Sequence, residues 1–133
     1  MKTLFIAQSA DTALTGLLLL ISPSAFVSLL FGSQLDDPLA SVIGRGAGVT
    51  VFSLGAAWWI LTRAGQTPSR IVGSMLFYDA AVMVVLLSAR FNQRLIGIGL
   101  WPAIALHFGF GIWCLVCFSK TAELEAGSRQ KLG

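Results

Sequence analysis

Four ionisable side chains lie inside otherwise apolar stretches of the sequence: Asp11, Arg45, Asp79 and His107. A charged side chain at the centre of a membrane helix costs roughly 2.5–3.5 kcal/mol on insertion scales, so such residues usually face a bundle interior or a wet cavity. A carboxylate beside an imidazole is able to hold or relay a proton, and an intramembrane carboxylate is able to bind a polar solute. These residues are therefore the first candidates for a binding site.

Three of the four lie at similar depth in their own apolar stretches. Counted at 1.5 Å per residue from the nearest basic residue at one end, Asp11, Asp79 and His107 lie about 13, 13 and 20 Å deep. We expect Asp79 and His107 to form a pair between neighbouring helices. The alternative for each is a structural hydrogen bond with no further role.

A polar stripe on the first apolar stretch adds two candidates. Gln8, Asp11 and Thr15 follow one another at spacings of three and four, which puts them on one face of a helix. We expect this face to look inward. The alternative is a helix that begins at Thr12, in which Asp11 would act as the N-cap.

Arg45 lies about 27 Å from the end at which the other three depths are counted, and therefore near the opposite face. Two interpretations are open. Its long side chain extends outward to lipid phosphate or to Asp36 and Asp37, or it bends inward to hold an anionic ligand or Asp79.

Two further patterns concern packing and thiol chemistry. Gly44, Gly48 and Gly55 have the small-residue spacing that lets helix backbones approach closely, within one bundle or between two copies. Cys114 and Cys117 form a CxxC pair, but they lie near a helix C-terminus, whose partial negative charge disfavours a reactive thiolate. We expect buried cysteines, and a membrane thiol oxidoreductase is an alternative function.

The composition indicates the elements that must position these residues. The chain has 133 residues, of which 56% are hydrophobic and 11% charged, whereas a soluble domain carries roughly 25% charged residues. The net charge of +3 is scattered, which argues against a nucleic-acid partner. The sequence shows no phosphate-binding loop, nucleophile elbow or zinc-ligand spacing, so we predict no catalytic residues and no metal.

Four apolar segments are each long enough to cross a bilayer as a helix. The prediction is an all-α integral membrane four-helix bundle that forms a single domain over 1–133. A short interfacial segment follows the first helix, although a single helix over 12–31 with a kink at Pro23 is an alternative. The predicted helices are 3–22, 39–62, 70–89 and 95–119, with the interfacial segment over 23–32 and a frayed tail over 120–133.

The basic residues predict how the bundle is oriented. Lys2, Arg63, Arg70, Lys120, Arg129 and Lys131 fall on one side and Arg90 and Arg94 on the other, which places both termini in the cytoplasm. The expected location is the inner (plasma) membrane. Trp58, Trp59 and Trp101 are expected in the aromatic belts at the membrane surfaces.

The chain resembles a group of small four-helix bacterial membrane proteins that includes DoxX-like ones. The resemblance implies a four-helix membrane fold and makes an accessory-subunit role conceivable, because some DoxX-like relatives are subunits of quinone-reducing oxidoreductases. It rests on the run Gly16–Leu20, on Pro23 and Gly32, on Arg45–Gly48 and Trp59–Arg63, and on Tyr78, Leu106, His107 and Phe110.

Two functions follow as the main hypotheses. The first is a membrane protein with a polar cavity at Asp11, Asp79 and His107 that binds or passes a small solute or a proton. The second is a non-catalytic accessory or structural subunit of a larger membrane complex. No cofactor is predicted, with lipid or quinone as conceivable ligands. Expected partners are membrane lipids, with either a second copy of the chain or a larger membrane protein.

Overall fold

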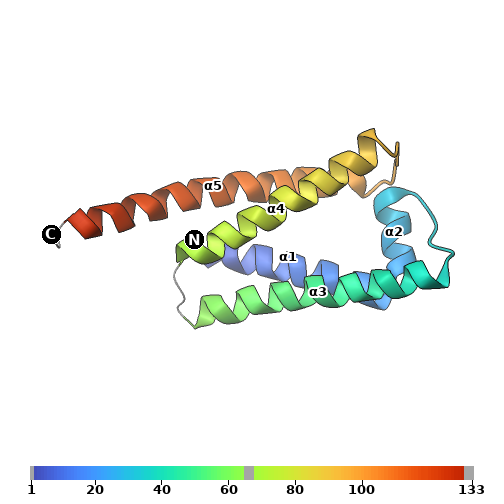
Figure 1. Ribbon diagram of the computed structural model, residues 1–133, viewed down its shortest axis with the longest axis horizontal. Helices are drawn as coiled ribbons and strands as arrows, with labels where there is room; N and C mark the ends of the chain where they lie inside the picture. Colours follow the sequence, from blue (N-terminus) through green and yellow to red (C-terminus); the bar gives the residue numbers. More distant parts are fainter. Residues whose placement is uncertain (1, 65–67, 131–133) are drawn as a thin grey trace.

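The computed structural model describes residues 2–64 and 68–130, and the side chains of 2–64 and 69–120. These ranges contain helices and no strand. Four helices, α1, α3, α4 and α5, are long and apolar enough to cross a membrane. In chain order the elements are α1 (Lys2–Ile21), α2 (Pro23–Phe31), α3 (Pro38–Arg63), α4 (Pro68–Phe91) and α5 (Leu100–Gln130) (Figure 1).

Proline marks the first residue of three helices. Pro23, Pro38 and Pro68 begin α2, α3 and α4, where the missing backbone N–H has no helical partner to lose. At α3 the side chain of Asp37 also accepts a hydrogen bond from the Leu39 backbone N–H at 2.9 Å. Gly32, with φ of 70°, ends α2 in the left-handed conformation that glycine adopts without a steric penalty.

The long helices form two antiparallel pairs, α1 with α3 and α4 with α5 (Figure 1). α2 runs across the end at which α1 stops and α3 starts. The direction of the first pair follows from its glycine contacts, since Gly16 lies against Gly48 whereas the earlier residue Ala13 lies against the later residue Gly55. The backbones of the two pairs approach each other closely at few places.

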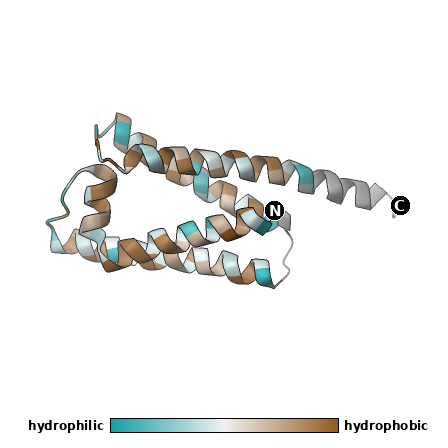
Figure 2. Ribbon diagram, turned by 180° about the vertical axis from the view of Figure 1, so that it is seen from behind, coloured by the Kyte–Doolittle hydropathy of each residue, from teal (hydrophilic) through white to brown (hydrophobic). Residues whose placement is uncertain are grey.

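Hydrophobic residues are spread along all the long helices (Figure 2), and many of their large apolar side chains are exposed on the outside. Ile60 on α3 and Phe77 and Val84 on α4 are each more than 60% exposed. A helix that is apolar all round is typical of a membrane span, because lipid replaces water as its surroundings.

Two apolar clusters lie at opposite ends of the helices, and the first of them joins the two pairs. The first contains Leu4, Trp58, Met75 and Cys114, one from each long helix. The second is built on Leu86, Leu100 and Ile104, with residues of α2 packed against it.

The observed helix bounds decide several sequence predictions. α1 ends at Ile21, and Ser22 has a non-helical φ of −139°, so a separate segment does follow the first helix, as α2, and the single kinked helix over 12–31 is wrong. The position of α2 in the membrane interface stays a prediction. Asp11 lies in the middle of α1, so the N-cap alternative is wrong as well.

α5 differs from prediction at both of its ends. It begins at Leu100 rather than near 95, because the preceding chain packs on α2, where Gly99 donates its backbone N–H to the Leu29 carbonyl at 2.9 Å. A Cβ atom on Gly97 would collide with the Leu30 backbone. α5 also continues to Gln130, where a frayed tail was expected from 120, and residues 131–133 lie outside the described part.

Trp58 corrects the prediction of aromatic belts. It is 2% exposed, and its indole N–H donates to Ser74 Oγ of α4 at 3.0 Å, so it is a core residue between α3 and α4. Its neighbour Trp59 is exposed and lies under the Arg63 guanidinium, 4.8 Å from the ring centroid. Trp101 is 56% exposed near the start of α5.

Candidate functional site

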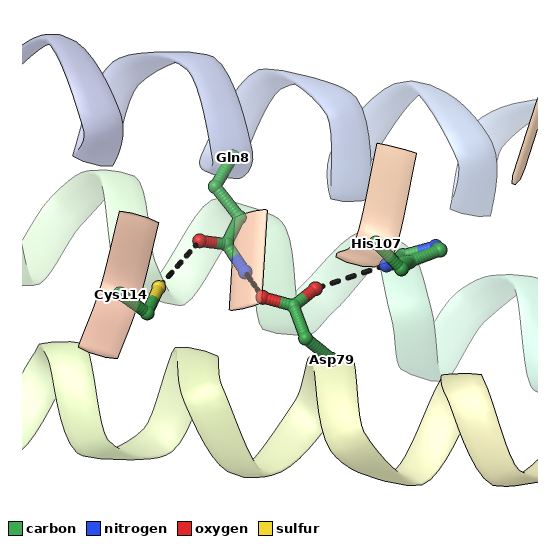
Figure 3. A network of polar contacts seen from close by, with 4 residues as sticks. All are labelled: Gln8, Asp79, His107 and Cys114. Atoms are coloured by element: carbon green, nitrogen blue, oxygen red, sulfur yellow. Dashed lines mark hydrogen bonds and ion pairs between the residues drawn. The ribbon is translucent and has the colours of Figure 1, made fainter. Parts of the chain in front are cut away.

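A chain of polar side chains links the two helix pairs through the middle of the molecule (Figure 3). Gln8 Nε2 of α1 donates to Asp79 Oδ2 of α4 at 2.7 Å. His107 Nδ1 of α5 lies 2.9 Å from the other oxygen, Asp79 Oδ1. The thiol of Cys114, also on α5, donates to Gln8 Oε1 at 3.3 Å. We call these four residues the polar chain.

The polar chain is almost completely enclosed. The exposed fractions of Gln8, Asp79, His107 and Cys114 are 1%, 2%, 9% and 0%. Buried polar groups are costly unless each finds a partner. The four residues meet that condition by satisfying one another, although they come from three helices.

The donors and acceptors of the polar chain fit together in one direction. The Cys114 thiol occupies the Gln8 oxygen, which turns the Gln8 amide nitrogen toward Asp79. A carboxylate that accepts from both Gln8 and His107 is matched at each oxygen, with the His107 proton on Nδ1. The second ring nitrogen, Nε2, points away from Asp79 (Figure 3), and in this tautomer it is an acceptor.

The Tyr78 ring packs against the imidazole of His107. The Tyr78 ring packs edge-on against His107 with centroids 5.9 Å apart, and against Trp58 at 5.5 Å. Such edge-to-face pairs fix ring orientation as well as adding contact energy. Tyr78 thus connects the polar chain with the apolar cluster around Trp58.

A cavity of about 560 Å³ lies beside the polar chain. Its volume falls within the range of roughly 300–1,000 Å³ that is typical of small-molecule sites. All five helices line it, and its walls are mostly apolar, with Phe26 and Phe31 contributed by α2. Its lining also contains Asp11, Thr15, Tyr78 and His107, whereas Asp79 and Gln8 lie behind the wall.

The structure separates the predicted site residues into two groups. Gln8 and His107 each form a hydrogen bond with Asp79, whereas Asp11 and Thr15 line the cavity without joining the polar chain. The α1 stripe therefore faces inward along its length but does two different things. His107 belongs to both groups, since it bonds Asp79 and also lines the cavity.

Arg45 lies outside both groups. Its guanidinium donates to the Leu20 backbone carbonyl at the end of α1, at 3.0 Å, and the residue is exposed. Neither Asp79 nor the loop acids Asp36 and Asp37 is its hydrogen-bond partner here. The two other expected partners, lipid phosphate on the outside and an anionic ligand on the inside, stay predictions. The bond satisfies one of the free carbonyls at the end of α1.

The glycines of α3 act inside the chain. Gly48 and Gly55 lie against the α1 backbone, and Gly44 lies against Pro23. The interpretation as packing within one bundle is therefore correct for these three. Gly16 of α1 completes the contact surface, and its spacing of three from Ala13, itself four after Ser9, was the signal for it, because small residues at these spacings share one helix face.

Cys114 is the site residue that sequence reasoning assigned only to packing. Both cysteines are buried, as expected, and neither forms a disulfide, yet Cys114 also contributes a hydrogen bond to Gln8. Its spacing of seven residues, two helical turns, from His107 was the available signal, because it places both side chains on one face of α5. Over the described ranges, no group of three or more His, Cys, Asp or Glu side chains is arranged to hold a metal ion.

Comparison of the chain with family models, with curated proteins and with solved structures finds no match. The resemblance to DoxX-like proteins stays a prediction.

Proposed function

We propose that this chain is an integral membrane protein that binds a small solute in the cavity between its two helix pairs. The observation that carries the proposal is the position of His107, which is held by Asp79 and still lines the cavity. A hydrogen-bonding atom in an apolar pocket orients a ligand, while the apolar walls supply contact area. The bond to Asp79 holds the imidazole in one orientation, and a carboxylate at Asp79 favours the tautomer that carries its proton on Nδ1.

Native mass spectrometry of the protein, extracted gently from its own membrane, tests the proposal. We expect a small molecule to accompany the intact chain, and we expect His107→Ala and Asp79→Asn to lose it. Gly109→Ala is the matched control on α5, because a Cβ atom there would meet nothing within 4 Å. An empty wild-type protein, or equal occupancy in all three variants, would contradict the proposal.

The same spectra test the second candidate function, an accessory subunit. The observation that favours it is the exposure of α3, because only 11% of its candidate membrane-spanning stretch is buried inside the molecule. Gly46, on its outer surface, is open as well. A stoichiometric protein partner without any small molecule would favour this function over solute binding.

The proposed orientation places both ends of the chain in the cytoplasm, at the inner membrane. Its support is the distribution of basic residues together with four candidate spans, since an even number of crossings returns the chain to its starting side. A fluorescent protein fused after Gly133 is expected to fold and fluoresce, while a periplasmic phosphatase fused there is expected to be inactive. The reverse pattern would overturn the orientation.

A further inference from the structure

Around the cavity, carboxyl groups outnumber basic side chains. Asp11 contributes a carboxyl group to the lining and His107 an imidazole, while Asp79 lies behind the wall. The described lining contains neither lysine nor arginine. Arg45, which follows the lining residue Gly44 on α3, is exposed and donates a hydrogen bond to a backbone carbonyl. Among the described residues of the lining, the Asp11 carboxyl group therefore has the imidazole of His107 as its one basic neighbour.

Asp11 has no partner of its own in the described part of the chain. It is half-buried in the middle of α1, and no hydrogen bond or ion pair joins it to another described residue. Asp79, by contrast, has both oxygens matched. A carboxylate beside apolar walls requires a proton, water or a cation to offset its desolvation.

The other polar atoms of the lining suit a donor. His107 Nε2 accepts a hydrogen bond when Nδ1 carries the proton, and a carboxylate at Asp11 accepts as well. The Tyr78 ring, with Phe26 and Phe31, adds aromatic walls. Aromatic faces attract organic cations within about 6 Å of the ring centroid.

From this arrangement we propose that the ligand is a hydrophobic amine, an apolar molecule that carries one protonated nitrogen. The proposal rests on the proposed function and names its ligand class. The ammonium group pairs with Asp11 and donates to His107 Nε2, while the apolar body fills the space lined by α2 and α4. An anionic head group is repelled by the Asp11 carboxylate, and a neutral alcohol leaves that charge unpaired.

Three molecules that share one apolar body separate these cases: 4-phenylbutylamine, 4-phenylbutanol and 4-phenylbutanoate. Binding is measured by isothermal titration to the full chain in nanodiscs of zwitterionic lipid, with empty nanodiscs as the reference for partition into lipid. We expect the amine to bind at least about tenfold more tightly than the alcohol, as for a charge-assisted hydrogen bond, and the carboxylate to bind most weakly.

Asp11→Asn identifies the residue that reads the charge. We expect it to bring the affinity for the amine down to that for the alcohol while leaving the alcohol unchanged. Asp36→Asn, which removes an exposed acid in the loop before α3, is the matched control and is expected to keep the preference.

The outcomes distinguish this inference from the function on which it rests. Equal binding of all three molecules, or a preference for the amine that survives Asp11→Asn, overturns the amine inference and leaves solute binding intact. If the alcohol or the carboxylate binds most tightly, the amine inference is overturned, solute binding is still supported, and the preferred head group is identified. Absence of binding by all three, together with an empty protein in the native spectra, overturns both.

Discussion

The two interfaces of the molecule are built in opposite ways. Between α1 and α3 the helices meet backbone to backbone, and Gly16, Gly48 and Gly55 leave no room for a single added carbon. Between the two helix pairs few backbone contacts form, and the space holds the polar chain and the cavity. Close packing therefore holds α1 and α3 together, while polar groups occupy the interface between the two pairs.

The close interface depends on small residues because apolar burial is a weak force between helices in lipid. Lipid tails are as apolar as leucine, so helices associate through close packing and hydrogen bonds. The α1–α3 pair relies mainly on close backbone packing, with one hydrogen bond from Arg45 to Leu20, and the interface between the pairs relies on the polar chain and the apolar cluster around Trp58. The comparison leads to four predictions, given from the largest expected effect to the smallest.

Gly48→Ala should cause the largest loss of stability. A Cβ atom there would lie 2.5 Å from the Leu20 backbone nitrogen, which has no flexible end to move aside, so α1 and α3 must separate. Overpacking of this kind costs about 1–3 kcal/mol. The free energy of unfolding in bicelles measures it. Gly46→Ala, two residues earlier with nothing within 4 Å of its Cβ, is the control, and equal effects of the two would refute the close contact.

The Asp79–His107 contact should give a measurable coupling energy. In a double-mutant cycle of Asp79→Ala and His107→Ala we expect about 0.5–2 kcal/mol of unfolding free energy, the range found for hydrogen bonds between membrane helices. The control cycle pairs Asp79→Ala with Ser119→Ala, whose hydroxyl donates to a carbonyl within its own helix. Additive effects in the first cycle would mean that the pair contributes nothing to joining α4 with α5.

Cys114 and Cys117 should not react with a membrane-permeant maleimide while the protein is folded. They are 0% and 6% exposed, and the Cys114 thiol donates a hydrogen bond to Gln8. Labelling is followed by mass shift before and after unfolding, and Val116→Cys, at an exposed site on the same helix, is the positive control. Rapid labelling of the native pair would revive the thiol oxidoreductase alternative.

Thr12→Val should have the smallest effect. The Thr12 hydroxyl is buried without a hydrogen-bond partner among the described residues, so removing it relieves an unmatched polar group. We expect the unfolding free energy to stay within about 0.5 kcal/mol of wild type or to rise. Thr62→Val is the comparison, because that hydroxyl donates to the Trp58 carbonyl at 2.7 Å. A clear loss at Thr12 would indicate a bonded water that joins the interface.

The sequence was a good guide to which residues face inward and a poor guide to what they contact there. Helical spacing correctly placed Gln8, Asp11 and Thr15 on an inward face, but it did not separate Gln8, which bonds Asp79, from the two that line the cavity. That separation depends on where α4 crosses α1, which neither segment encodes alone. The prediction for Trp58 was wrong for the same reason, and the bond from Arg45 to the Leu20 carbonyl was not predicted, since both partners lie on other helices.

What the sequence alone determined is the set of long apolar helices, because composition and length decide whether a segment needs lipid around it and whether it spans the required distance. It also determined the breaks, since proline and glycine act on their own backbone. Tertiary structure decided the pairing of α1 with α3, the polar chain of Gln8, Asp79, His107 and Cys114, and the cavity beside it. These features depend on distances between side chains up to 106 positions apart, and only the packed helices fix such distances.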